Sequence, residues 1–340
     1  MDHTIVLLPG DGIGPEVTDA VVHVLERAGA PFVYTTRLAG QAAVDAGKGD
    51  TLPEETLQAI REHRLALKGP CTTPIGKGFS SVNVGLRKRL NLYAAVRPVR
   101  SLPGVSTRFD GVDLVVVREN TEGLYAGIEN EIVDGVIVSM KVATRAACHR
   151  IAHWAFRYAN QKRRAKVSLF HKANIMKMSD GLLLEEARKV HAIDYSNIAY
   201  EELIIDAAHM KLVQDPSRFD IILCENLYGD IVSDLCAGLV GGLGVCPGAN
   251  FGDDAAVFEA VHGSAPDIAG KKLANPLALL MSAVMLLRHV SDSRADARCA
   301  VAAERIEAAY GKALVDGATT RDLGGTLGTF EFADAVVQRL

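Results

Sequence analysis

Short apolar runs alternate along the chain with longer segments in which apolar residues recur every three or four positions. The short runs are typical of buried β-strands, and the longer segments are typical of amphipathic helices. Strands are predicted at residues 4–10, 32–39, 65–69, 112–120, 165–173, 198–206 and 220–227. Helices are predicted at residues 15–29, 54–63, 81–90, 143–160 and 181–193. The alternation predicts an α/β fold with helices on both faces of a sheet.

One stretch interrupts this alternation. Residues 129–144 (ENEIVDGVIVSMKVAT) form an island of β-type alternation before the next predicted helix. The island predicts either an arm or a small additional sheet.

The turn PGDGIGPE at residues 9–16 follows a strand and opens a helix, which invites a dinucleotide-binding interpretation. Its spacing is G-x-G-x-G, whereas the Rossmann fingerprint is G-x-G-x-x-G. The fingerprint also requires an acidic residue near the end of the second strand, where this chain offers Arg37. The Rossmann interpretation is therefore rejected, and a tight structural turn explains the loop equally well.

Composition narrows the class of protein. The chain has 340 residues, 49% of them hydrophobic, and a net charge of −4, as expected for a globular protein with one large or two medium domains. That charge gives no reason to expect nucleic acid or membrane as a partner. No apolar run approaches a membrane span, and the N-terminus resembles a first strand more than a signal peptide. Six scattered cysteines fit a reducing compartment, so we expect a cytoplasmic protein.

Residues whose side chains can bind anions are concentrated between residues 81 and 118. The predicted helix at 81–90 places Ser81, Asn83 and Arg87 near its start, and Arg97 and Arg118 stand near the ends of other expected elements. Planar guanidinium groups hold carboxylates in bidentate fashion, so the group predicts a small polyanionic substrate. Its members are Ser81, Asn83, Arg87, Arg97 and Arg118.

A second group consists of acids. Asp206 ends a predicted strand, and Asp230 and Asp234 stand four residues apart before an apolar segment. If that stretch is helical, both carboxylates lie on one face and repel each other, so a positive group should lie between them. Three oxygen donors without Cys or His at ligand spacing suit Mg²⁺ or Mn²⁺.

Three further groups complete the candidate chemistry. Lys172 and Asn174 follow a predicted strand, and Tyr125 lies in the loop beyond Arg118. A lysine near a metal ion can have its pKa lowered and act as a base. A divalent metal, a polycarboxylate, a Lys and a Tyr together are typical of metal-assisted oxidation and decarboxylation of a hydroxy acid.

The chain resembles the isocitrate and isopropylmalate dehydrogenase family along essentially its whole length. The motifs that carry the resemblance occur in the family's order: LPGDGIGPEV, TTPIG, SSVNVGLRKRLNLYAAVRPVR, VRENTEGLYAGIE, HKANIMK, NLYGDIVSDLCAGLVGGLGVCPGANFG, FEAVHGSAPDIAGK and ANP. The resemblance implies two domains around a mixed central sheet, without a Rossmann fold. The large domain would comprise residues 1–98 and 245–340. The small domain would comprise residues 99–244, with the dimer interface and an arm near 126–144.

The resemblance also implies roles for individual residues. Arg87, Arg97 and Arg118 resemble the arginines that clamp the substrate carboxylates, and Ser81 and Asn83 the pair that reads the γ-carboxylate of isocitrate. A further substrate contact falls on Asn174.

The catalytic and metal roles follow in the same way. Tyr125 resembles the acid that protonates the enol, and Lys172 the base that acts on the α-hydroxyl. Asp230 and Asp234 resemble metal ligands of the home subunit. Lys172 and Asp206, also a metal ligand, would reach in from the neighbouring subunit of a homodimer. A divalent ion is thus the expected positive group between Asp230 and Asp234.

Cofactor preference follows from the segment HGSAPDIAGKKLANP. The family resemblance places the dinucleotide against these residues: Ile13, Thr72, His262, Gly263, Asp267, Ile268 and Asn275. Asp267 and Ile268 stand where NADP users of the family carry Lys-Tyr. A carboxylate accepts hydrogen bonds from ribose hydroxyls and repels a 2′-phosphate, so NAD is expected.

Substrate identity rests on Ser81 and Asn83, where isopropylmalate enzymes carry apolar residues. Isocitrate fits best. Cys71, Ala95 and Ala207-Ala208 depart from the commoner residues, which leaves room for homoisocitrate or another malate with an acidic β-substituent, including a phosphonate. A non-catalytic regulatory subunit is the competing class, but such subunits are expected to lose catalytic groups that this chain retains.

Overall fold

The computed structural model describes residues 2–73 and 81–340; residue 1 and residues 74–80, which include the end of the TTPIG motif, lie outside the described part. The chain divides into two compact units. Unit 1 comprises residues 1–90, 101–108 and 240–340, and unit 2 comprises residues 91–100 and 109–239. Each unit is described by itself.

Unit 1 contains five strands in the spatial order β2-β1-β3-β12-β11. β1 pairs in parallel with β2 and β3, β3 pairs in parallel with β12, and β11 runs antiparallel to β12. The strands are β1 (His3–Leu8), β2 (Phe32–Thr36), β3 (Leu65–Lys68), β11 (Pro247–Phe251) and β12 (Ala256–Ala260). The last four residues of β1 and all of β3 are buried, as their unbroken apolar runs predict.

Helices cover this part of the sheet and pack on one another. They are α1 (Gly14–Arg27), α2 (Gln41–Asp45), α3 (Glu54–His63), α4 (Val82–Arg89), α9 (Leu277–Arg294), α10 (Ala297–Val315) and α11 (Thr329–Val337), with short 3₁₀ turns at Leu243–Val245 and Arg321–Leu323. α1 has a proline in its first turn, and Gly29, at φ +76°, follows its end, which are the boundary signals of the sequence. α9 is apolar on most of its surface and packs against β11 and β12 in the core of unit 1.

Unit 2 contains five strands in the spatial order β4-β5-β10-β8-β9. They are β4 (Ala94–Arg100), β5 (Asp113–Glu119), β8 (Lys166–His171), β9 (Ala199–Ile204) and β10 (Ile221–Cys224). β4 runs antiparallel to β5, and the other neighbours pair in parallel. The helices of unit 2 are α5 (Arg145–Gln161), α6 (Ser179–Asp194), α7 (Ile205–Gln214) and α8 (Asn226–Leu239), with a 3₁₀ turn at Pro216–Arg218.

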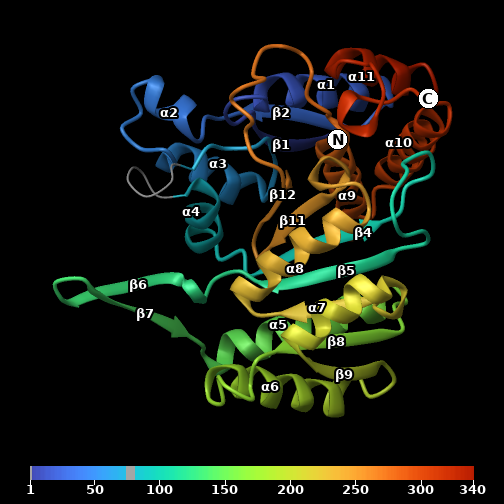
Figure 1. Cartoon of the computed structure of the whole chain (residues 1–340). Helices are drawn as coiled ribbons and strands as arrows, with labels where there is room; N and C mark the ends of the chain where they lie inside the picture. The colour runs from blue at the N-terminus through green and yellow to red at the C-terminus, as the bar shows by residue number, and fades with distance from the viewer. Residues whose placement is uncertain (1, 74–80) are drawn as a thin grey trace. The chain divides into compact units, whose positions relative to one another are not determined.

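A two-stranded ribbon made of β6 (Gly123–Val133) and β7 (Val136–Val142) extends from the rest of unit 2 (Figure 1). Its strands pair only with each other. Most of its side chains are exposed, including large apolar ones such as Ile132 and Ile137, at 65% and 66%. The island of alternation is therefore an antiparallel hairpin.

The predicted α/β class with a mixed sheet is confirmed. The expected domain boundary after residue 98 differs from the observed division, because it falls inside β4, which pairs along its whole length with β5 of unit 2. Among the described residues, no helix combines the length and apolarity that a membrane span requires.

Three local expectations were wrong. Tyr125 lies in β6, not in a loop, because the ribbon begins at Gly123. Asp206 lies in the first turn of α7, because β9 ends two residues earlier. Arg87 lies in the last turn of α4, not near its start, because that helix is only eight residues long.

Candidate active site

Lys172 and Asp206 form an ion pair in unit 2. The Lys172 Nζ lies 2.7 Å from Asp206 Oδ1, and the hydrogen bond from Lys172 lowers the pKa of Asp206. The Asp206 side chain is 68% exposed, and Asn174 lies exposed in the turn that follows Lys172. The predicted base and one predicted metal ligand therefore meet at the surface of the single chain.

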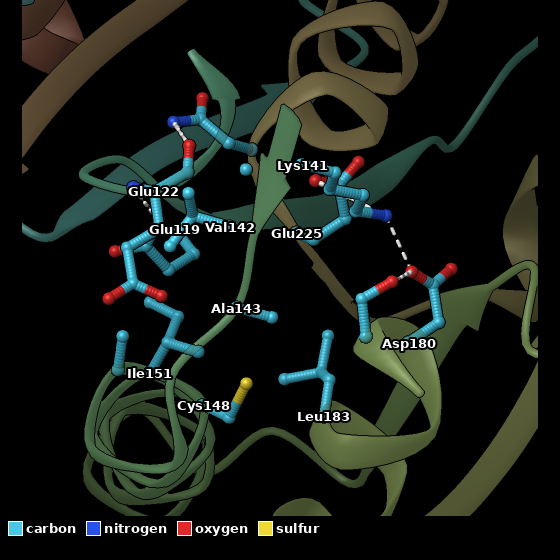
Figure 2. Close-up of a pocket in the computed structure, with 14 residues that line it drawn as sticks. Glu119, Glu122, Lys141, Val142, Ala143, Cys148, Ile151, Asp180, Leu183 and Glu225 are labelled. Atoms are coloured by element: carbon cyan, nitrogen blue, oxygen red, sulfur yellow. Dashed lines mark hydrogen bonds and ion pairs between the residues drawn. The ribbon is translucent and has the colours of Figure 1, made fainter. Parts of the chain in front are cut away.

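Asp180, at the start of α6, holds the segment that carries Lys172. Its Oδ2 accepts a hydrogen bond of 2.7 Å from the Lys172 backbone N–H, and its Oδ1 pairs with Lys141 of β7. Figure 2 shows Lys141 beside Asp180 and Glu225. These three residues line a cavity of about 30 Å³, together with Cys148 and Leu183. Burial raises the pKa of Glu225. Sequence reasoning missed this charged group, although a lysine in an otherwise apolar ribbon strand was a usable signal.

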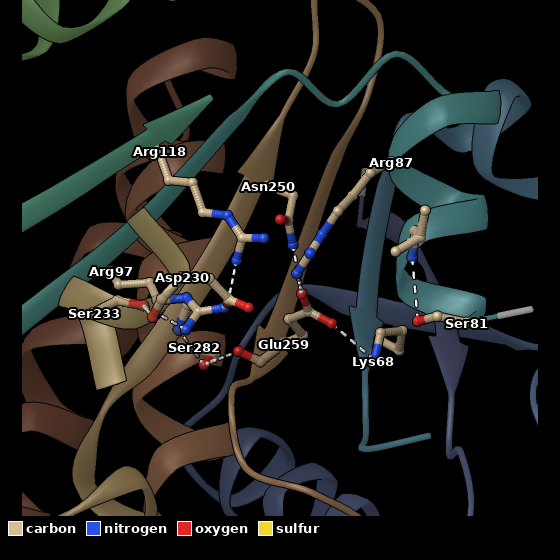
Figure 3. Close-up of polar contacts among 12 residues, drawn as sticks. Lys68, Ser81, Arg87, Arg97, Arg118, Asp230, Ser233, Asn250, Glu259 and Ser282 are labelled. Atoms are coloured by element: carbon tan, nitrogen blue, oxygen red, sulfur yellow. Dashed lines mark hydrogen bonds and ion pairs between the residues drawn. The ribbon is translucent and has the colours of Figure 1, made fainter. Parts of the chain in front are cut away.

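The second group of site residues in unit 2 centres on Arg118. Its guanidinium pairs with Asp230 of α8 (Figure 3). It also donates to Asn226 Oδ1 from Nε and Nη2, at 3.0 and 2.7 Å. The Arg118 side chain is 2% exposed. Gly229 makes this packing possible, because a Cβ at position 229 would lie 2.6 Å from Arg118 Cβ.

Tyr125 joins this group from the start of the ribbon. Its hydroxyl donates to Asp230 Oδ2, and the Arg118 guanidinium lies 5.0 Å from the centre of its ring. Burial and the hydrogen bond to Asp230 raise the pKa of Tyr125. The phenol consequently keeps its proton at neutral pH and can donate it.

Arg97 of β4 supplies the second cation. Its Nη1 lies 2.8 Å from Ser233 Oγ and 3.1 Å from Asp234 Oδ1, and its Nη2 lies 3.7 Å from Asp230 Oδ1. Burial raises the pKa of Asp234, Arg97 opposes that change, and Asp230 adds to it. Within the chain, Arg97 and Arg118 are therefore the positive groups that offset the repulsion between Asp230 and Asp234.

The remaining substrate candidates lie on α4 in unit 1. Ser81 caps the helix and accepts a long hydrogen bond of 3.5 Å from the Val84 N–H. Asn83 Oδ1 and Arg87 Nε are buried and have no hydrogen-bond partner within residues 2–73 and 81–340. Because buried polar atoms are rarely left unpaired, we expect both atoms to have a polar partner outside those ranges.

A buried charge network supports Arg87 from β3 and β12. Glu259 Oε1 lies 3.3 Å from Arg87 Nη2 and accepts from Asn250 at 2.7 Å, and its Oε2 lies 2.8 Å from Lys68 Nζ (Figure 3). Burial opposes ionisation, but Lys68 and Arg87 outweigh it and lower the pKa of Glu259 to about 2. Sequence reasoning missed Lys68 and Glu259; a charge inside each of two short apolar strands was the available signal.

Two of the cofactor candidates in unit 1 contact Ser264, and two others precede it directly in the chain. The Ile13 N–H donates to the Ser264 carbonyl at 2.9 Å, and Thr72 Oγ1 lies 2.7 Å from Ser264 Oγ. His262 Nδ1 lies 3.0 Å from the Gly263 carbonyl. His262 Nε2 is buried without a partner among the described residues, and burial lowers the pKa of the ring.

The last three cofactor candidates follow in the chain. Asp267 is exposed in a turn, and Ile268 closes that turn through its N–H to the Ala265 carbonyl at 3.1 Å. Asn275 is 9% exposed and donates to Asp322 at 2.9 Å, while its Oδ1 accepts from the Leu277 N–H. Asp322 was not predicted as a neighbour of this segment.

The acids fit a hard divalent cation by their chemistry, since all three offer carboxylate oxygens. They do not form one cluster in the described part of a single chain, where the only set of three His, Cys, Asp or Glu groups close enough to share an ion is His3, Asp296 and Cys299. Asp296 of that set is already held by Arg298 at 2.7 Å. Asp230 and Asp234 come together on α8, and Asp206 lies apart with Lys172.

Comparison with known proteins shows to which family the chain belongs. The isocitrate/isopropylmalate dehydrogenase family matches residues 4–336. Catalytic subunit 5 of the mitochondrial NAD isocitrate dehydrogenase of Arabidopsis thaliana is 50% identical over 339 residues, 99% of this chain and 88% of the relative. A regulatory subunit of the mitochondrial NAD isocitrate dehydrogenase of Dictyostelium discoideum is 49% identical, covering 99% and 91%. The crystal structure of isocitrate dehydrogenase from Methylococcus capsulatus superposes with a TM-score of 0.93 at 50% identity, covering 99% of both chains. This chain belongs to the isocitrate/isopropylmalate dehydrogenase family.

Proposed function

We propose that this chain catalyses the NAD-dependent oxidative decarboxylation of isocitrate to 2-oxoglutarate with Mg²⁺ or Mn²⁺. The observation that carries the proposal is the interlocked group of Arg97, Arg118, Tyr125, Asp230 and Asp234 in unit 2. It joins carboxylate-binding cations, a protonated phenol and two oxygen ligands in one place. Family membership and relatives that are named NAD isocitrate dehydrogenase subunits support the same reaction.

The arginines would bind the carboxylates of the substrate. Arg97 and Arg118 have fixed positions, because Ser233 and Asn226 hold them independently of the aspartates. Guanidinium groups already in place hold substrate carboxylates with little loss of side-chain entropy. At the start of α4, Ser81 and Asn83 would read the third carboxylate, which isopropylmalate lacks, and Arg87 would join the other arginines in holding substrate carboxylates.

Different residues would accept and donate protons in the reaction. Lys172 takes the proton of the α-hydroxyl while the hydride of the same carbon passes to the nicotinamide of NAD. The resulting 2-oxo acid loses CO₂, and the electron pair of the broken bond forms an enolate. Tyr125 then protonates the carbon that carried the lost carboxylate. The phenol of Tyr125 is protonated at neutral pH, as a tyrosine ordinarily is, and burial and the hydrogen bond to Asp230 raise its pKa further.

Asp230 and Asp234, with Asp206 of a second subunit, would hold the divalent cation. Such a cation supplies positive charge that stabilises negative charge on the α-oxygen of the substrate. NAD would lie along Ile13, Thr72, His262, Gly263, Asp267, Ile268 and Asn275. The exposed carboxylate of Asp267 favours NAD over NADP, because a 2′-phosphate beside it would be repelled.

A homodimer with shared sites completes the proposal. The ribbon of β6 and β7 exposes Ile128, Ile132, Ile137 and Met140, and an isolated two-stranded hairpin is marginally stable in water. A second copy would bury these side chains and bring its Lys172 and Asp206 to the partner's Asp230. Light scattering of the purified chain tests this, since a monomer at micromolar concentration would contradict it. The expected cytoplasmic location stays a prediction.

The reaction is tested by kcat/KM of the purified chain with NAD and Mg²⁺ or Mn²⁺. We expect isocitrate to exceed homoisocitrate, isopropylmalate, malate and tartrate. A higher kcat/KM for homoisocitrate, or for a malate with a phosphonate substituent, would identify that compound as the substrate instead. The likeness to a regulatory subunit makes one further outcome meaningful. If the chain alone is inactive but stimulates a catalytic subunit, it is the non-catalytic partner of a multimeric enzyme.

A further inference from the structure

The carboxylate of Asp11 ties together two separate segments of unit 1. Asp11 stands in the PGDGIGPE turn and is 6% exposed. Its Oδ1 accepts a hydrogen bond of 3.0 Å from the N–H of Ala42, in the first turn of α2. Its Oδ2 accepts one of 2.8 Å from the N–H of Thr72. One buried side chain therefore serves two backbone donors that lie 30 residues apart in the chain.

The turn that carries Asp11 is itself fixed to its neighbours. The Asp11 N–H donates to the Pro70 carbonyl at 2.7 Å, two residues before Thr72. A Cβ at Gly12 would lie 2.0 Å from the Ser264 carbonyl oxygen, so only glycine permits this approach. Ser264 in turn contacts Thr72 through their hydroxyls at 2.7 Å. The glycine turn, the Thr72 segment and the Ser264 segment thus form one rigid assembly within unit 1.

The orientation of the Asp11 carboxylate is also fixed. A Cβ at Gly40 would lie 2.1 Å from Asp11 Oδ2, and Gly40 has a φ of +81°, which favours glycine. The side chain therefore fills the space beside Gly40 and has little freedom to rotate. A longer acidic side chain would not fit there without displacing α2.

We propose that Asp11 is a positioning residue for the dinucleotide, acting through Thr72. This inference rests on the proposed function, in which Ile13 and Thr72 contact NAD. In a Rossmann fold the glycine turn itself binds the phosphates of the dinucleotide. In this chain the glycine turn would instead supply the Asp11 carboxylate, which holds the neighbouring cofactor-binding segment at Thr72. The Asp11 carboxylate offers one acceptor oxygen to each N–H donor, whereas an amide side chain has a single oxygen beside an NH₂ donor group.

The decisive variant is Asp11→Asn, which keeps the shape of the side chain but turns one acceptor into a donor. Either Ala42 or Thr72 then faces an N–H group instead of an oxygen. The matched control is Asp19→Asn, which removes the same charge from an exposed position on α1. NAD binding is measured by calorimetry, and KM for NAD, KM for isocitrate and kcat are measured by turnover.

We expect Asp11→Asn to raise the NAD dissociation constant and KM about tenfold, because an unpaired buried donor typically costs that much. KM for isocitrate and kcat should change less than about threefold, and the control should match wild type. Unchanged NAD affinity in Asp11→Asn would overturn the inference. Equal losses in all three kinetic parameters would also overturn it, since they would indicate a general structural role.

Amide hydrogen exchange on the wild-type chain covers the case in which Asp11→Asn does not fold. The amides of Ala42 and Thr72 should be protected before NAD is added, because both donate to a buried carboxylate. If the amides of Ala42 and Thr72 exchanged as fast as free loop amides, Asp11 would not hold these two segments. If wild type neither binds NAD nor oxidises isocitrate, the proposed function fails, and the exchange result still decides whether Asp11 holds the Thr72 segment.

Discussion

Arg118 and Gly229 lie so close that no side chain fits at position 229: a Cβ there would stand 2.6 Å from both Arg118 Cβ and Cγ. Gly229→Ala should therefore displace α8 or Arg118 and lower the free energy of unfolding by about 1–3 kcal/mol, as overpacking does. Gly238→Ala is the matched control, because it lies in the same helix with nothing within 4 Å of its added Cβ. Urea unfolding should show the control to be as stable as wild type or more so. Equal stability of both variants would contradict the close approach.

Removal of a metal ligand should cost far more activity than stability. Asp230→Asn or Asp206→Asn should lower kcat/KM by about 10²–10³-fold, because a group that supports developing charge contributes a few kcal/mol to the barrier. Calorimetry should show weaker Mn²⁺ binding in both variants. Asp194→Asn, an exposed aspartate at the end of α6, is the control. Turnover that persists undiminished in EDTA would exclude the metal.

The proposed acid and base should fail at different steps. Tyr125→Phe should slow protonation of the enol more than hydride transfer, whereas Lys172→Met should abolish oxidation itself. Full turnover by Tyr125→Phe would refute its role as the acid.

Mixing the same two variants tests whether the sites are shared between subunits. In a mixed dimer, one site would combine an intact Tyr125 with an intact Lys172 from the other chain. Statistical exchange of subunits should restore about a quarter of wild-type activity, since about half of the dimers are mixed and each has one intact site. Failure to recover activity, with subunit exchange shown independently, would place both residues in the same subunit's site.

Cofactor preference should depend on charge at residue 267. NADP carries about two additional negative charges at the 2′-phosphate, so wild type should prefer NAD about a hundredfold or more. Asp267→Lys with Ile268→Tyr should weaken NAD and admit NADP, through loss of repulsion as much as gain of an ion pair. The comparison needs kcat/KM for both cofactors. An unmoved ratio in the double variant would exclude Asp267 as the selector.

The network of Lys68 and Glu259 predicts a pH dependence of stability. The pKa of Glu259 is lowered to about 2 in the folded chain, against about 4.3 in an unfolded one. The unfolded state therefore binds the proton first, and the stability that Glu259 contributes is present above about pH 4 and lost as pH falls towards 2. Glu259→Gln should lower the free energy of unfolding by about 3–5 kcal/mol at pH 7, because the buried Lys68 loses its carboxylate counter-ion and keeps only the Gly69 carbonyl.

The difference between wild type and Glu259→Gln should shrink as urea unfolding is repeated at lower pH. Glu62→Gln, on the exposed face of α3, should differ little from wild type throughout. A difference that does not depend on pH would mean that Glu259 is not ionised in the folded chain.

The sequence predicts those features that depend on neighbours along the chain. The strand that carries Arg118 and the β-type alternation at residues 129–144 were recognisable because their patterns are local. Asp230 and Asp234 could be placed on one face because helical spacing alone determines it. The need for a positive group beside them followed from charge.

Features that depend on pairing between distant segments were not predictable. Lys68 stands opposite Glu259 only because β3 and β12 pair in that register, and no local pattern specifies this. The pairing of Arg97 and Arg118 with the two aspartates likewise depends on how β4 and β5 meet α8. The position of Arg87 within its helix was also missed, because α4 has only eight residues and Arg87 lies in its last turn.

The internal pairing of Arg97 and Arg118 with Asp230 and Asp234 has a consequence for the order of assembly. A polycarboxylate that draws the arginines away leaves the aspartates uncompensated, and a cation that takes the aspartates leaves the arginines uncompensated. Each ligand thereby improves the site for the other, and the two affinities must rise by the same factor. We therefore expect anion and cation to bind cooperatively, and either one alone to bind only weakly.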